Sequence, residues 1–204
     1  MSILILFYVL IDVINSFILS EGSYFEREDN TMRVTIETER LILRPVVPDD
    51  YEAAFKWCGD PKVNKYMIYP LYTKAEDVRT YFESRNLDDP DNYDLGFVLK
   101  ETGELIGQGG LVYVPEKDAW TLGYNIRADQ WGHGYAVEAM EGIMKEIRKT
   151  RTIKAIIGEF AEENNKSRRV MEKLGMHYVG DHEYEKMDKS AKFKSKLYRR
   201  DFTD

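Results

Sequence analysis

The residues best suited to chemistry in this sequence form a short run with two glycines, QWGHGYA, from Gln130 to Ala136. Alternating apolar residues precede the run and a period of about 3.6 residues follows it, so we expect it to join a strand to a helix. The unpaired N–H groups and the dipole at a helix N-terminus attract anions, and small residues let the backbone approach them. The run lacks the Gly-Lys-Ser/Thr of a P-loop and the three glycines of a dinucleotide fingerprint. Because many such turns are only tight turns, the run predicts anion binding without identifying the anion.

The elements around the run follow from periodicity and from turn residues. We expect strands at 34–43, 93–100, 104–114, 119–127 and 152–160, and two more between 176 and 202. We expect helices between 49 and 60, at 74–86, after the run to about 149, and at 164–174. This order predicts one mixed α/β domain whose central β-α-β unit carries the two-glycine run.

The composition limits the class of protein. With 204 residues and 43% hydrophobic content, the chain can bury one sizeable core. Its 29 Lys and Arg against 36 Asp and Glu give a net charge of −7, which repels phosphate backbones, so we expect no nucleic-acid partner. The same acidity suits a cationic substrate, although acidic residues also serve solubility.

The cysteine and histidine content argues against disulfide and metal chemistry. Cys58 is the only cysteine, so no intrachain disulfide can form, and we expect a reducing, cytoplasmic setting. Cys58 follows Trp57 in an amphipathic run, which favours packing over a role as nucleophile. His133, His177 and His182 lack the i, i+4 spacing of helical zinc ligands, and we predict no metal site.

The first 31 residues do not fit the domain pattern. Residues 3–19 are apolar but are broken by Asp12, Asn15 and Ser16, so they are too short and too interrupted to predict a membrane-spanning helix. Three readings stay open: a membrane anchor, an added helix, or translation assigned upstream of a start at Met32. We favour the third, and so expect an extension and linker at 1–31, a domain at 32–204, and no membrane partner.

Around the two-glycine run, the sequence resembles the GNAT superfamily of N-acetyltransferases of the RimJ/RimL type. Trp131 to Ala136 matches the x-Gly-x-Gly-x-Ala form of that family's acetyl-CoA loop. The letters LGYN at 122–125 precede it, and the motif NxxSxxVMEKLGM at 164–176 follows one strand later, at the family's usual distance. ETERLILR at 37–44 is similar to the subgroup's first strand, and 60–67 resembles its substrate-side loop. The resemblance covers about residues 34–202.

The resemblance implies an α/β (α+β) domain with a mixed, mostly antiparallel central sheet of about seven strands, flanked by about four helices. Strands 119–127 and 152–160 would splay apart, so that the pantetheine arm of acetyl-CoA enters the gap and pairs with the exposed strand edge. The pyrophosphate would bind N–H groups of the two-glycine loop. Asn164 is also the expected N-cap of its helix, and it can fill both roles. The implied cofactor-binding residues are Tyr124, Asn125, Ile126, Trp131, Gly132, His133, Gly134, Tyr135, Ala136, Asn164 and Ser167.

The implied activity is acetyl transfer from acetyl-CoA to a primary amine, either a protein amino terminus or a small amine, by direct attack on the thioester. Many relatives place a glutamate base where this sequence has Thr121, so Glu159 on the next strand is the candidate base; its other reading is a solvated strand residue. The tyrosine proton donor of many relatives aligns with Met171. Ser167 is therefore the candidate donor, unless it is only a polar first-turn residue. Tyr124 is a further candidate, whose implied role is to shape the cleft.

Thr121 and Met171 also leave a rival reading open, a CoA-binding module that has lost catalysis and serves as a sensor or assembly part. Tyr66, Tyr69 and Tyr72 either receive a cationic amine or cover the core. The sequence does not identify the amine acceptor, and it leaves a homodimer open.

Overall fold

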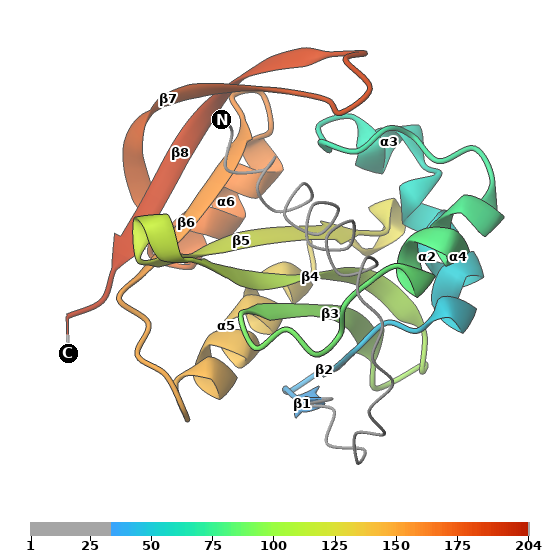
Figure 1. The fold of residues 1–204 in the computed structure, drawn as a ribbon, viewed down its shortest axis with the longest axis horizontal. Coiled ribbons are helices and arrows are strands. Elements are labelled where there is room, and N and C mark those ends of the chain that lie inside the picture. The colour runs from blue at the N-terminus through green and yellow to red at the C-terminus, as the bar shows by residue number, and fades with distance from the viewer. Residues whose placement is uncertain (1–33, 204) are drawn as a thin grey trace, which may run out of the picture.

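A sheet of eight strands is the centre of the computed structural model, which describes residues 34–203 (Figure 1). The expected extension at 1–31 and the start at Met32 lie outside the described residues. The strands are β1 (Ile36–Glu37), β2 (Leu41–Arg44), β3 (Asn92–Leu99), β4 (Leu105–Val114), β5 (Ala119–Ile126), β6 (Ala155–Ala161), β7 (His177–Glu185) and β8 (Lys192–Asp201). The helices are α2 (Tyr51–Cys58), α3 (Pro61–Asn64), α4 (Ala75–Glu83), α5 (Tyr135–Ile147) and α6 (Asn165–Lys173).

The strand order is β1-β2-β3-β4-β5-β6-β8-β7, and every neighbouring pair is antiparallel except the parallel pair β5–β6. The mixed, mostly antiparallel α/β fold expected from the sequence is therefore confirmed. Within the described residues it has eight strands and five α-helices, one more of each than we expected.

The additional strand arises because residues 34–43, expected as one strand, form a hairpin. β1 pairs with β2 through Ile36–Leu43 and Glu37–Ile42. Thr38 closes the turn, since its N–H donates to the Leu41 carbonyl at 2.9 Å and its hydroxyl oxygen accepts the Leu41 N–H at 3.0 Å. A threonine side chain can replace backbone partners in this way, and the turn carries no glycine or proline to signal it.

The additional helix, α3, begins at the pair expected to end a helix. Asp60 stands at the N-cap, where its carboxylate accepts the Lys62 N–H at 2.8 Å, and Pro61 occupies the first helical position. Asp before Pro stops one helix and starts the next because it caps N–H groups that have no partner within the new helix.

The splayed strand pair expected from the sequence is also confirmed. β5 and β6 pair only through Trp120–Ile156 and Thr121–Ile157. Beyond these pairs, β5 stays paired with β4 to Ile126, and β6 stays paired with β8 to Ala161. The two strands thus leave a gap between their carboxyl-terminal halves, and each has a free edge there.

The two faces of the sheet carry separate cores (Figure 1). α5 and α6 pack on one face, where Ile143 and Ile147 of α5 are fully buried. α2 and α4 pack on the other face with Trp57 and Cys58, and burial raises the pKa of the Cys58 thiol to about 12. A thiol with so high a pKa is a poor nucleophile at neutral pH, in agreement with the expected packing role. No helix within residues 34–203 has the length and apolar character to cross a membrane.

Candidate active site

The two-glycine run joins β5 to α5 in a conformation that only glycine adopts readily. Gly132 and Gly134 have φ angles of 88° and 85°, and Gly134 is the N-cap of α5 without a side chain to cap it. The first N–H groups of α5 therefore lack the usual capping acceptor and are available to an anion.

A clamp from the β1–β2 turn holds this loop. Glu138, in the first turn of α5, accepts hydrogen bonds from the Thr38 hydroxyl at 2.6 Å and the Arg40 backbone N–H at 2.7 Å. Its other oxygen accepts from Arg40 Nε at 2.7 Å, while Arg40 Nη1 donates to the His133 carbonyl at 2.9 Å. The Arg40 guanidinium also lies 4.7 Å from the centre of the Tyr135 ring. The ETERLILR segment at 37–44 thus holds the two-glycine loop in place.

A groove runs from this loop to the gap between β5 and β6. Of the eleven cofactor-binding residues expected from the sequence, ten line it. The exception is His133, whose ring stacks on Tyr135 at 5.5 Å and whose carbonyl faces Arg40. The groove is also basic, because it has one acidic lining residue, Glu163, and five basic ones: Lys62, Lys65, Lys166, Arg169 and Lys173.

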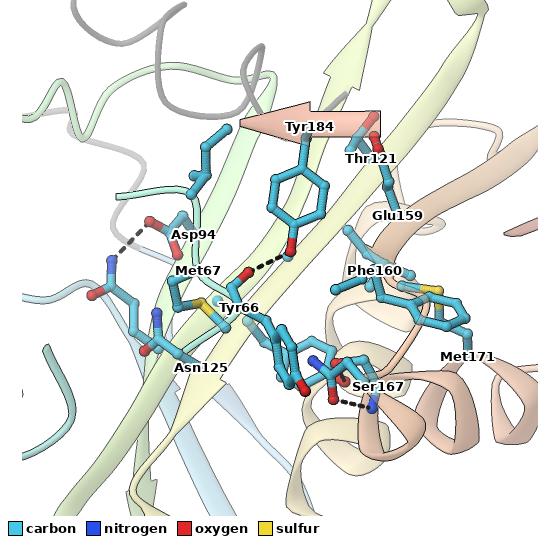
Figure 2. Close-up of a pocket in the computed structure, with 18 residues that line it drawn as sticks. Tyr66, Met67, Asp94, Thr121, Asn125, Glu159, Phe160, Ser167, Met171 and Tyr184 are labelled. Carbon is cyan, nitrogen blue, oxygen red and sulfur yellow. Dashed lines mark hydrogen bonds between the residues drawn. The ribbon is translucent and has the colours of Figure 1, made fainter. Parts of the chain in front are cut away.

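A second cavity lies beyond the gap and shares part of its lining with the groove (Figure 2). The two cavities meet at Tyr124 and Ser167, where the tyrosine hydroxyl donates to Ser167 Oγ at 3.3 Å. Ser167 is held in turn by Asn164, whose side chain accepts the Ser167 N–H at 3.2 Å as the N-cap of α6. Burial raises the pKa of Tyr124 to about 12, despite the opposing effect of the Ser167 hydrogen bond. The tyrosine therefore keeps its proton at neutral pH.

Glu159 stands in the lining of this second cavity, and its side chain has no exposed surface. The reading of Glu159 as a solvated strand residue is wrong, because β8 and β7 cover it. Ser195 of β8 donates its hydroxyl to Glu159 Oε1 at 2.6 Å, and His182 Nδ1 of β7 lies 3.1 Å from the same oxygen. Thr121 also lines the cavity, and its buried hydroxyl has no hydrogen-bond partner in the described part of the chain.

Met171, which we expected to stand where many relatives have a tyrosine, packs in the splayed region. Its terminal methyl would lie 2.5 Å from a Cβ built on Gly158 of β6, and Leu122 of β5 would be 3.3 Å from the same point. Met171 therefore fills the space between the two diverging strands, and only glycine at 158 leaves room for it.

Sequence reasoning missed a polar group on β3 and β4. Asp94 is buried in the cavity lining, and its Oδ2 accepts hydrogen bonds from Gln108 Nε2 and Arg85 Nη2, each at 2.8 Å. The Asp94 and Arg85 side chains are 6% and 3% exposed, so this is a buried ion pair. A signal was present, because Asp94 is the only charged residue in the strand NYDLGFVL.

The three tyrosines expected either to receive a cationic amine or to cover the core, Tyr66, Tyr69 and Tyr72, lie in different places. Tyr66 lines the cavity, and its carbonyl accepts the hydroxyl of Tyr184 at 2.7 Å (Figure 2). Tyr69 is buried against Tyr72, with ring centres 6.0 Å apart, and neither lines the cavity. The cavity lining therefore includes one of these three tyrosines together with Tyr184 of β7.

Comparisons with known proteins agree with this geometry. The family model described as an acetyltransferase (GNAT) domain matches residues 40–177. An uncharacterized N-acetyltransferase of Bacillus licheniformis, p20, is 27% identical over 150 residues, which cover 72% of this chain and 84% of that protein.

Two solved structures show the same fold. A GNAT-family acetyltransferase from Bacillus anthracis has a TM-score of 0.70 and 24% sequence identity, covering 82% of this chain and 98% of that chain. The Microcin C7 self-immunity acetyltransferase MccE, crystallised with acetyl-CoA and AMP, has a TM-score of 0.66 and 16% identity, covering 80% of this chain and 93% of that chain.

Proposed function

This chain belongs to the GNAT acetyltransferase family, and we propose that it transfers the acetyl group of acetyl-CoA to a primary amine by direct attack on the thioester. The observation that carries the proposal is the meeting of a basic groove and an acidic cavity at Tyr124 and Ser167, inside the gap between β5 and β6. The resemblance of the ETERLILR and NxxSxxVMEKLGM motifs to the RimJ/RimL type supports assigning the chain to that subgroup. The buried lone Cys58 suits a reducing cytoplasm.

The groove fits acetyl-CoA in charge and in shape. Bound acetyl-CoA supplies the thioester carbonyl that the amine attacks. The N–H groups from Gly132 to Ala136 bind the pyrophosphate, and the five basic residues of the groove attract the phosphates. The free edge of β5 beyond Thr121 pairs with the amides of the pantetheine arm. That MccE, with the same fold, was crystallised with acetyl-CoA supports this placement.

The residues at the junction have complementary tasks. Glu159 faces the cavity where the amine would enter, so it removes the proton that the attacking nitrogen must lose. Ser167 protonates the departing thiolate, and Tyr124 orients Ser167 through its hydrogen bond. The demand on this donor is modest, because a thiol with a pKa near ~8.5 is a good leaving group.

The test combines binding with turnover. We expect calorimetric titration of acetyl-CoA to show binding to the parent protein and to Gly103→Val, but not to Gly134→Val. Both glycines have positive φ, 71° and 85°, and neither has an atom within 3.5 Å of the added Cβ, so the two variants carry similar backbone strain. Only Gly134 lies in the groove.

Turnover is followed as CoA release with a panel of primary amines. Release that depends on the amine supports the enzyme. Acetyl-CoA binding with no release for any amine would instead favour the catalytically silent module. Equal binding by the two glycine variants would show that the loop does not hold the cofactor.

A further inference from the structure

A histidine at the edge of the sheet connects the buried Glu159 to the surface. The Glu159 side chain has no exposed surface, whereas the ring of His182 is 39% exposed. His182 Nδ1 lies 3.1 Å from Glu159 Oε1, so the ring contacts the buried carboxylate and solvent at the same time. It can do both because β7, which carries His182, is the last strand in the order of the sheet.

Strand register places this histidine. Ser195 of β8 stands directly opposite His182 of β7, and directly opposed residues have their side chains on the same face of a sheet. Ser195 is buried, and its hydroxyl donates to the same Glu159 oxygen at 2.6 Å. The carboxylate oxygen is thus held between a buried hydroxyl and an imidazole that can exchange protons with water.

Tyr184 and Lys117 also act electrostatically on Glu159. Burial, together with the charge of Glu159, raises the pKa of Tyr184, so this tyrosine keeps its proton at neutral pH. Lys117 lies in the turn between β4 and β5; burial lowers its pKa and outweighs the opposing effect of Glu159. A route for protons between Glu159 and solvent must therefore be sought at His182 and compared with Lys117.

The proposed reaction must release one proton to solvent in each turnover. A primary amine is an ammonium at neutral pH, since its reference pKa is roughly 8 to 10. Its nitrogen loses two protons on the way to the amide, and the departing thiolate gains only one. The second proton leaves the site. A base whose side chain is shielded from water needs a neighbour that passes this proton on.

We propose that His182 is a positioning residue that acts through Glu159, holding its carboxylate and carrying its proton to the solvent. This inference rests on the proposed acetyl transfer with Glu159 as the base. The proton moves from the ammonium to the Glu159 carboxylate, then to His182 Nδ1, and the imidazolium releases a proton from Nε2 to water. The ring begins with its proton on Nε2 and ends with it on Nδ1, and exchange with water restores the first tautomer. Imidazole suits this task because one ring nitrogen can accept a proton while the other releases one.

Three variants of the full chain separate a proton relay from a simple hydrogen bond. His182→Ala removes the imidazole, and His182→Asn keeps an N–H donor near the position of Nδ1 but cannot pass a proton on. His177→Ala is the matched control, because His177 is an exposed histidine of the same strand outside both cavities. The rate is measured at neutral pH as acetylated product from a panel of primary amines, with and without added imidazole.

We expect His182→Ala and His182→Asn to lower kcat alike, by about 10²-fold, the lower end for a group that transfers protons. Added imidazole should raise the kcat of His182→Ala by about tenfold or more, because it can enter the vacated space and carry the proton. His182→Asn and His177→Ala should not respond to imidazole. The Kd for acetyl-CoA should be the same in all three variants, since His182 and His177 line neither cavity.

Other outcomes would overturn the relay and leave acetyl transfer standing. If His182→Asn turns over as fast as the parent protein, the hydrogen bond to Glu159 is sufficient. If imidazole restores nothing in His182→Ala, the histidine does not carry the proton. If Lys117→Met loses activity while the His182 variants keep it, the proton leaves through Lys117.

Two results would reach further than His182. Parent-like turnover by Glu159→Gln would remove Glu159 as the base, and the relay with it. A parent protein that acetylates none of the amines would overturn the proposed function itself.

Discussion

Glu138→Gln is the sharpest test of how the β1–β2 turn controls the cofactor loop. The side chain of Glu138 is 14% exposed and accepts hydrogen bonds from Thr38 and from both the backbone and the guanidinium of Arg40. Glutamine keeps the size of this side chain, but it removes the charge and replaces one acceptor oxygen with a donor that faces Arg40. The loop then loses its anchor, because Arg40 also holds the carbonyl of His133.

The loss of stability expected for Glu138→Gln follows from the hydrogen bonds that Glu138 accepts from Thr38 and Arg40. Hydrogen bonds to a charged group contribute about 1.5 to 3 kcal/mol in buried settings, and the 44% exposure of the Arg40 side chain reduces this. We expect the free energy of unfolding to fall by about 1 to 2 kcal/mol. If about 1 kcal/mol of this couples to the loop, the Kd for acetyl-CoA rises about fivefold.

The stability that Glu138 contributes should decrease as the pH falls. Burial acts to raise the pKa of Glu138, but the hydrogen bonds from Thr38 and Arg40 outweigh it, so the pKa lies below its usual value. The clamp therefore contributes fully above the unfolded-state pKa of roughly 4.3 and is lost as the pH falls through the folded-state pKa. The stability difference between the parent and Glu138→Gln should be largest at neutral pH and shrink toward pH values below about 4.

The assay is urea unfolding at a series of pH values, with calorimetric titration of acetyl-CoA at pH 7. Glu141→Gln is the matched control, because Glu141 is an exposed residue of the same helix and its change removes the same charge. If the two variants have the same free energy of unfolding and the same Kd for acetyl-CoA, Glu138 does not act as a clamp on the loop.

Two further predictions concern the junction of the cavities. Glu159→Gln should lower kcat/KM by about 10²- to 10⁴-fold, because the base is lost; an unchanged kcat/KM would assign proton removal to another group. Ser167→Ala should lower kcat by about 10²-fold, the lower end for a general acid, with little change in KM for acetyl-CoA. Tyr124→Phe should add little to Ser167→Ala, because both act through one hydrogen bond; additive losses would give Tyr124 a separate role.

Local sequence patterns were enough to predict the central β-α-β unit. The run from Gln130 to Ala136 contains its own turn, and the change of period from two to 3.6 marks the strand and helix on either side. Asn164 was predictable as an N-cap for the same reason, because capping involves residues only three positions apart. A turn or a helix cap depends only on residues a few positions apart, so it can be predicted from a single sequence.

The second cavity could not be predicted because its residues come together only through strand register. Asp94 meets Gln108 across β3 and β4, and Glu159 meets His182 and Ser195 across three strands. No sequence spacing encodes those pairings. The same limit explains the mistaken reading of Glu159, whose burial depends on the strands that follow it in the chain.

The net charge of −7 conceals the feature that matters most for function, which is where the charges lie. An acidic surface repels a ligand with several phosphates unless basic residues line the approach to its site. Here three basic residues of α6 line the groove on one side of the gap: Lys166, Arg169 and Lys173. The second cavity has no basic lining residue, and its two carboxylates, Asp94 and Glu159, are paired with Arg85 and His182. In the proposed reaction the phosphates of acetyl-CoA would therefore lie on the basic side of the splayed strands, and the amine would reach the thioester from the second cavity at the junction of Tyr124 and Ser167. The opposite placement would put the phosphates where no lining residue is basic.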